Sequence, residues 1–198
     1  MQKRLSYGAM TAIILGTLLL DQVSKYIIKT NMHLGQSIPV LGNFFRITYV
    51  ENPGMAFGVR IQNGTLFSTL SIIAALLVFY YLFRLRKGGW VLQSALSLIA
   101  AGAIGNLLDR FLYGKVVDFL DFEFFDISIP AFRIFGFNFS GYNMTRWPVF
   151  NVADSAVTIG MMLLIAYILF WGDPLKNLTY GPSEENVDSS LEKENQGQ

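Results

Sequence analysis

The 198-residue chain contains no cysteine, and its one histidine is His33. The absence of cysteine excludes disulfide bonds, thiolate catalysis and sulfur ligands for metals, and it also excludes lipid modification on cysteine. A single histidine cannot supply the cluster of ligands that a zinc site usually contains, so a metal site would require several carboxylates. We therefore expect the protein to work without a metal or other cofactor.

Charged residues are also scarce. They make up 15% of the chain, whereas 53% of the residues are hydrophobic, 15% are aromatic, and the mean hydropathy is +0.42. A soluble domain normally carries less apolar sequence. A helix needs roughly 20 predominantly apolar residues to cross a membrane, and four segments approach this length, at about residues 5–28, 66–83, 91–109 and 149–172. We predict an all-α membrane protein with four transmembrane helices, a small extracytoplasmic β-sheet and an aromatic-rich interfacial loop.

The predicted organisation is a four-span membrane domain over residues 1–172, followed by a polar, disordered tail over residues 173–198. An even number of spans places both termini on one side. The short link RLRKGGW favours the cytoplasm for itself and for both termini, although the longer connections also carry basic residues. A cleaved signal peptide is the alternative for the first span, but the small-residue cleavage site is missing. Residues 29–65 and 111–148 then share the extracytoplasmic side, where we expect the functional site.

Both long connections carry informative patterns. The stretch NFFRITYV, residues 43–50, alternates apolar and polar side chains and predicts a strand with one apolar face. ENPGMAFG, residues 51–58, follows it and predicts a turn. In the loop of residues 120–147, phenylalanine is interleaved with Asp121, Glu123, Asp126 and Arg133, a composition typical of the headgroup region. Our hypothesis is that this loop forms a lid or a membrane-resting flap; the alternative is an amphipathic segment that covers apolar protein surface.

Ionisable groups at membrane depth are costly, at about 2.5–3.5 kcal/mol each, and each one therefore needs a partner. Asp21 and Lys25 are four residues apart on one helical face, which predicts a mutual ion pair with a structural role. Gly102, Asn106 and Arg110 form a stripe at the end of the third span, where a small residue lets another helix approach. Asn106 and Arg110 would aim hydrogen-bond donors across this face; alternatively, Arg110 extends to the membrane interface beside Asp109.

Two further aspartates approach the second long connection from opposite ends. Asp118 lies between apolar residues, and Asp154 follows Asn151 by three positions at the start of the fourth span. If folding brings the two carboxylates within a few ångströms, both cannot ionise and the pair shares a proton. Such a pair can supply acid and base in one site, but proton or ion pathways also use paired aspartates. A serine–lysine pair at Ser24 and Lys25 is disfavoured because adjacent helical residues diverge by roughly 100°.

Five stretches in order resemble the bacterial lipoprotein signal peptidases, also called signal peptidase II, which are aspartic proteases of the cytoplasmic membrane. They are DQVSK at 21–25, ENPGMAFG at 51–58, GAIGNLLDR at 102–110, GKVVDF at 114–119 and FNVADS at 150–155. The resemblance extends from about residue 5 to 172 and implies that Asp118 and Asp154 form the catalytic dyad. It also implies supporting or substrate-binding roles for a larger set: Asn52, Gly54, Asn106, Arg110, Asn151, Asp21 and Lys25. The stretch between the two aspartates is longer and richer in phenylalanine than the family pattern.

The same resemblance implies the substrate, a precursor lipoprotein whose cysteine carries diacylglycerol, which is cut on the amino side of that cysteine. The expected partners are this prolipoprotein and membrane lipids, without nucleic acid, and the enzyme is expected to be a monomer of the cytoplasmic membrane. A proton-coupled carrier is the rival from another class. It is disfavoured because carriers are often built from internal repeats, which the two pairs of spans do not show. A scaffold that uses the acidic tail would leave the polar clusters unexplained.

Overall fold

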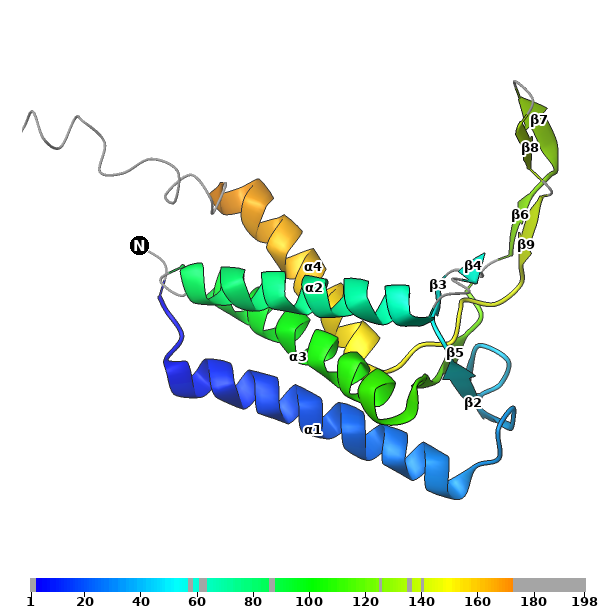
Figure 1. Ribbon diagram of the computed structural model, residues 1–198, viewed down its shortest axis with the longest axis horizontal. Coiled ribbons are helices and arrows are strands. Elements are labelled where there is room, and N and C mark those ends of the chain that lie inside the picture. Colours follow the sequence, from blue (N-terminus) through cyan, green and yellow to red (C-terminus); the bar gives the residue numbers. More distant parts are fainter. Residues whose placement is uncertain are drawn as a thin grey trace, which may run out of the picture.

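A computed structural model describes residues 3–56, 59–60, 64–85, 88–124, 126–134, 137–139 and 141–172 of the chain. The predicted disorder of the tail concerns residues outside this described part. The described residues form four helices, α1 (Tyr7–Asn31), α2 (Gly64–Arg84), α3 (Trp90–Tyr113) and α4 (Val152–Trp171). Figure 1 shows them as one elongated bundle with the strands gathered at one end, which we call the sheet end. The site residues predicted from the sequence lie toward this end.

Helix α3 is the central element because it contacts α1, α2 and α4. Among the described residues, α1, α3 and α4 are long and apolar enough to cross a membrane, and α2 adds the shorter apolar stretch Ile72–Arg84. The apolar window of α3 is 67% buried, against 17% in α1 and α4, so the outer two helices keep most of their apolar surface exposed. Exposed apolar helix surface of this kind suits a lipid environment. Four membrane crossings remain a prediction.

Glycine makes the close packing of α3 against α4 possible. A Cβ atom built on Gly102 would lie 2.7 Å from Cγ2 of Val157 and closer still to the carbonyl oxygen of Ala153. A Cβ on Gly160 of α4 would in turn lie 2.8 Å from the carbonyl oxygen of Ala95. The two backbones can approach this closely only because neither glycine has a side chain. The small residues predicted to admit a neighbouring helix therefore do so, and the neighbour is α4.

A three-stranded antiparallel sheet covers the sheet end of the bundle. It has the order β1 (Ser37–Leu41), β2 (Phe45–Asn52) and β5 (Val116–Phe122), and a second small ladder joins β3 (Met55–Ala56) to β4 (Val59–Arg60). The strand predicted within residues 43–50 is confirmed as β2. Its Tyr49 packs in an apolar cluster with Val117 and Phe119 of β5 and with Ile28 of α1. This cluster fixes β5 against the end of α1.

The phenylalanine-rich loop forms a long β-hairpin. Strands β6 (Ile127–Ile129) and β9 (Tyr142–Met144) pair near its base, and β7 (Phe132–Ile134) pairs with β8 (Phe137–Phe139) near its tip. Figure 1 shows the hairpin extending away from the helices. With nine short strands in four sheets among the described residues, the all-α description was wrong. The reason is that both long connections carry alternating apolar and polar residues, which pair as strands.

Arg146 holds the base of this hairpin against the three-stranded sheet. Its guanidinium group pairs with Asp121 of β5, with an Nε to Oδ1 distance of 2.7 Å, and with Glu123. It also donates to the backbone carbonyl of Asn43 at 3.0 Å. The Arg146 side chain therefore joins the end of the hairpin to β5 and to the turn at Asn43, which precedes β2. Whether the hairpin acts as a lid or as a membrane-resting flap stays a prediction.

Replacing Gly102 with alanine should destabilise the protein, because the new methyl group would collide with the backbone of α4. Overpacking of this kind typically costs about 1–3 kcal/mol. Gly16→Ala is the matched control, since a Cβ at Gly16 of α1 meets no atom within 4 Å, and it should leave stability unchanged or raise it by up to about 1 kcal/mol. Thermal unfolding in detergent measures both. Equal melting temperatures of the Gly102→Ala and Gly16→Ala variants would contradict the close contact between α3 and α4.

Candidate active site

Asp118 lies on β5 and is buried, with 3% of its surface exposed. Its Oδ1 accepts a hydrogen bond from Nδ2 of Asn151 at 2.7 Å, and its Oδ2 accepts one from Nδ2 of Asn52 at 3.1 Å. Burial, followed by the nearby charge of Asp154, raises the pKa of Asp118 from 3.8 to about 7, although both amide hydrogen bonds oppose the rise. This carboxyl group can therefore carry or release a proton near neutral pH.

Asp154 lies in the first turn of α4, where its position follows from helix capping. Asn151 is the N-cap: its side-chain oxygen accepts from the Asp154 backbone N–H at 2.9 Å, and Oδ2 of Asp154 accepts from the Asn151 N–H at 3.2 Å. This reciprocal pair is a capping box, and a carboxylate at this point is also favoured by the helix dipole. The other oxygen, Oδ1, accepts from Nδ2 of Asn106 at 2.7 Å. One hydrogen bond to each carboxylate oxygen therefore fixes the orientation of the Asp154 side chain.

Asn151 links the two aspartates directly. Its side chain donates to Asp118, while its backbone N–H donates to Asp154. Its Nδ2 also lies 3.1 Å from Oδ1 of Asn106, which holds Asp154 from the α3 side. Asn151 is fully buried, and these contacts hold its amide group in place. Asp118, Asp154, Asn106 and Asn151 thus lie in one connected cluster, while the roles expected for them stay predictions.

Lys25 supports this arrangement from α1. Its Nζ lies 2.9 Å from Oδ2 of Asp21, 3.0 Å from Oδ1 of Asn106 and 3.0 Å from Oδ2 of Asp109. These three acceptors match the three N–H donors of a lysine ammonium group. The predicted Asp21–Lys25 ion pair is confirmed, and it has a second carboxylate. Because Oδ1 of Asp21 also accepts from the backbone N–H of Ala153 at 2.9 Å, the cluster reaches the start of α4.

Gly54 and Arg110 have more indirect positions. Gly54 has a φ angle of 119°, which favours glycine, and its N–H donates to Oδ1 of Asn52 at 3.0 Å. It therefore orients the amide that contacts Asp118. Arg110 donates to the carbonyl oxygen of Asn106 at 3.3 Å, and its positive charge interacts with those of Asp118 and Asp154. Both residues belong to the surroundings of the aspartates, and the substrate-binding or supporting roles expected for them stay predictions.

Two supporting residues were missed from the sequence, namely Asp109 and Gln22. Asp109 is buried and accepts from Lys25, from the backbone N–H of Val117 at 3.2 Å and from Nε2 of Gln22 at 3.1 Å. The available signal was the spacing of Asp109 three residues after Asn106, which puts both on one side of α3. From the sequence, Asp109 is considered only as the residue beside Arg110 at the membrane interface. Within the described part of the chain, no three metal-ligating side chains gather in one place.

The fold and this cluster define a helical membrane protein with a two-aspartate site at the sheet end. Residues 13–170 match the family model described as signal peptidase (SPase) II. The chain is 37% identical over 169 residues to the lipoprotein signal peptidase of Staphylococcus aureus strain JH9, covering 85% of this chain and 93% of that protein. It is also 37% identical over 153 residues to the lipoprotein signal peptidase of Syntrophus aciditrophicus strain SB, covering 75% and 84%. The chain therefore belongs to the signal peptidase II family, a family of proteases.

Solved structures agree with this assignment. A bacterial membrane enzyme superposes with a TM-score of 0.66 at 37% identity, covering 85% of this chain and 92% of that one. A second bacterial membrane enzyme gives a TM-score of 0.64 at 37% identity, with coverage of 86% and 98%. The resemblance found in the sequence is thus confirmed at the level of family.

Removing the charge of Lys25 should destabilise the protein strongly, because Lys25→Met leaves Asp21 and Asp109 buried without their cation. Breaking a buried pair in this way typically costs about 3–5 kcal/mol. Lys115→Met is the matched control. Lys115 pairs with Glu51, but 44% of its side chain is exposed, so the expected loss is at most about 1 kcal/mol. Unfolding in detergent compares the two variants, and similar losses would show that the Lys25 cluster is not a structural centre.

Stability should fall as pH rises from about 4 to 7. The folded-state pKa of Asp118 is about 7 and its ordinary value is 3.8, so in this window the folded protein binds more protons than the unfolded chain. The slope of stability against pH is then negative. Asp118→Asn cannot ionise and should flatten this part of the profile while raising stability above pH 7. Melting temperatures between pH 4 and 8 test this, and an unchanged slope in the variant would assign it to another group.

Proposed function

We propose that this protein is an intramembrane aspartic endopeptidase that removes signal peptides from diacylglyceryl-modified prolipoproteins. The observation that carries the proposal is the connection of Asp118 and Asp154 through one buried residue, Asn151. Membership of the signal peptidase II family and the names of the relatives support the substrate class. Cleavage falls on the amino side of the lipidated cysteine, as the resemblance implies.

The proposed chemistry divides two roles between the aspartates. The ionised carboxylate takes a proton from a water molecule, whose oxygen adds to the scissile carbonyl carbon. The protonated carboxyl donates its proton to the carbonyl oxygen as the tetrahedral intermediate forms. The carboxyl that took the water proton then gives it to the leaving nitrogen, while the other carboxylate takes a proton from a hydroxyl group of the intermediate. The C–N bond breaks, the dyad returns to its starting protonation, and the signal peptide and a lipoprotein with a free cysteine amine are released. The raised pKa of Asp118 supports this exchange because it brings proton loss close to neutral pH.

The surrounding amides keep the aspartates oriented during this cycle. Asn52 contacts Asp118 and Asn106 contacts Asp154, while Asn151 contacts both. A signal peptide is an apolar helix that must unwind before its peptide bond can be attacked, which exposes backbone groups that need polar partners. The loop that carries Asn52 and Gly54, together with Arg110, is suited to supply them. Specificity for lipidated cysteine then arises from anchoring of the lipid tails on apolar helix surface.

The proposed topology rests on an even number of spans, which puts both termini on one side, and on the basic link RLRKGGW, which favours the cytoplasm for that side. Residues 1–172 form a four-span domain of the cytoplasmic membrane, with both termini cytoplasmic and the sheet end extracytoplasmic. A site on that side meets prolipoproteins after their export and lipid modification. The substrate and the surrounding lipids are the proposed partners, and the enzyme acts as a monomer without a cofactor.

Asp118→Asn and Asp154→Asn should each lower cleavage of a diacylglyceryl-modified prolipoprotein by at least about 100-fold, the usual scale of acid–base catalysis. Asp126→Asn is the control, because Asp126 is exposed near the base of the hairpin and should keep full activity. Mass spectrometry should identify a product that begins with the lipidated cysteine. Substrate binding by the inactive variants separates chemistry from recognition. Full activity in either dyad variant would remove that residue from the mechanism.

A further inference from the structure

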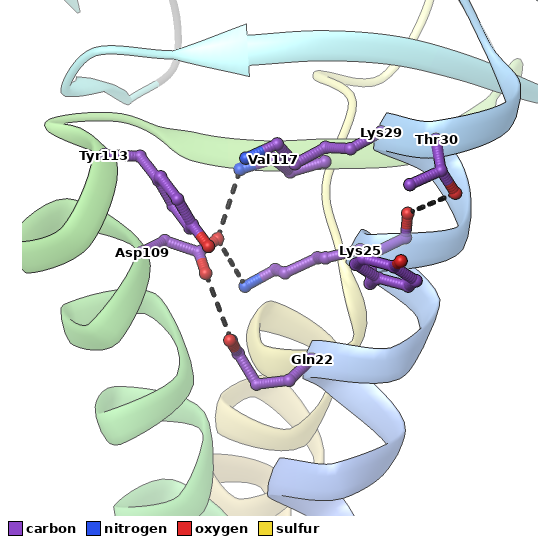
Figure 2. A pocket seen from close by; sticks show the side chains of 8 residues that line it. Gln22, Lys25, Lys29, Thr30, Asp109, Tyr113 and Val117 are labelled. Carbon is purple, nitrogen blue, oxygen red and sulfur yellow. Dashed lines mark hydrogen bonds and ion pairs between the residues drawn. The ribbon is translucent and has the colours of Figure 1, made fainter.

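A pocket of about 410 Å³, lined by both polar and apolar groups, lies between the sheet ends of α1 and α3. Figure 2 shows Lys29 and Thr30 of α1 on one side and Tyr113 of α3 on the other, with Lys25 and Asp109 deeper in the pocket. Neither catalytic candidate, Asp118 or Asp154, is among the residues that line it. The pocket is therefore separate from the proposed active site, although the two share the Lys25 cluster.

The deep charges of this pocket are already satisfied. The three donors of Lys25 meet three acceptors, and Oδ2 of Asp109 accepts from Lys25 and from the Val117 N–H while its Oδ1 accepts from Gln22. A ligand thus gains nothing by competing for them. The floor is a fixed polar surface that hydrogen bonds within the protein have already organised.

Lys29 has a different environment. Its Nζ lies 3.5 Å from the ring centroid of Tyr113, and among the described residues no carboxylate lies within ion-pair distance of it. The charge of Lys29 acts on the carboxylate of Glu51, but that carboxylate is already held by Lys115 and accepts from the Tyr49 hydroxyl at 3.0 Å. The Lys29 ammonium is therefore half-buried and positioned by an aromatic ring, and it keeps its capacity to bind an anion.

An exposed apolar stripe leads to the pocket along α1. It consists of Leu15, Leu19, Val23 and Tyr26, which are 59%, 66%, 45% and 68% exposed. Their spacing of four, four and three residues places them on one face of the helix. Thr30 and Lys29 continue this face by one turn. At the end of this membrane-crossing segment, a cation lies next to an apolar helix face. A phospholipid has the matching arrangement, with an anionic phosphate group next to apolar acyl chains.

We propose that this pocket binds the phosphate group of a membrane phospholipid, with an acyl chain along the apolar stripe of α1. Lys29 supplies the positive charge and the Tyr113 hydroxyl supplies a hydrogen bond. The lipid occupies a pocket that neither aspartate lines, and its site does not depend on the proposed protease activity. The pocket recognises the phosphate group, and this group belongs to a lipid and not to a free phosphate ion.

Native mass spectrometry of the detergent-purified protein tests the proposal with phosphatidylglycerol and with diacylglycerol of the same chains. Phosphatidylglycerol should be retained more strongly. Lys29→Met should weaken its binding about fivefold, the effect of one lysine at an anionic lipid surface, and Lys29→Arg should restore it. Arg84→Met is the matched control. Arg84 lies 6.0 Å from the ring centroid of Tyr80 in the last turn of α2, so this variant removes a similar ring-stacked cation elsewhere and should bind normally.

A second measurement does not depend on folding of the variants. Phosphatidylglycerol with a photoreactive headgroup should crosslink the wild-type protein at Tyr26, Thr30 or Tyr113. Crosslinks confined to other regions would overturn the proposal, as would equal retention of diacylglycerol, unchanged binding by Lys29→Met, or an equal loss in Arg84→Met. Displacement of the headgroup crosslink by millimolar inorganic phosphate would assign the pocket to a free anion and overturn the lipid assignment. Cleavage assays do not enter either test, so failure here leaves the protease proposal intact.

Discussion

The buried ammonium group of Lys25 is the constraint on which the sheet end of the molecule depends. An isolated charge in this position would be strongly unfavourable, and it is tolerated because Asp21, Asp109 and Asn106 surround it at hydrogen-bonding distance. The same two carboxylates also accept backbone N–H groups from the first turn of α4 and from β5. One cation thereby ties α1, α3, α4 and the sheet together.

This cluster also orders the two catalytic candidates. Asn106 accepts from Lys25 and donates to Asp154, so the position of that carboxylate depends on a charge in α1. Asn151 performs two tasks at once, because it caps α4 and joins Asp154 to Asp118. Structural stability and the proposed chemistry therefore rest on the same hydrogen bonds. Oriented groups of this kind do not have to be rearranged when the reaction takes place.

The polar cluster separates two surfaces that meet lipid in our proposals. On one side, the aspartates face the loop that carries Asn52, where a lipid-modified substrate would be cut. On the other side, Lys29 and the apolar stripe of α1 form the proposed phospholipid site, with the Lys25 cluster as its floor. Each surface combines exposed apolar helix with a few polar groups near the helix ends. Such surfaces require few charged groups, which agrees with a chain in which only 15% of the residues are charged.

The sequence by itself determined the apolar segments, the strand at β2 and the Asp21–Lys25 pair, because these follow from local composition and from spacing along one element. The proposed catalytic pair, Asp118 and Asp154, was suggested by the positions of the two aspartates in the sequence, and its role was implied by the resemblance to the family. Only the tertiary structure decided that Asn151 bridges the aspartates, that Asp109 shares Lys25, and that the phenylalanine-rich loop is an extended hairpin. The contacts of Asn151 and Asp109 join residues far apart in the chain and depend on how closely α3 packs against α1 and α4, which no local pattern encodes. The hairpin depends on which strands of the loop pair with each other, and the alternating pattern alone does not specify that pairing.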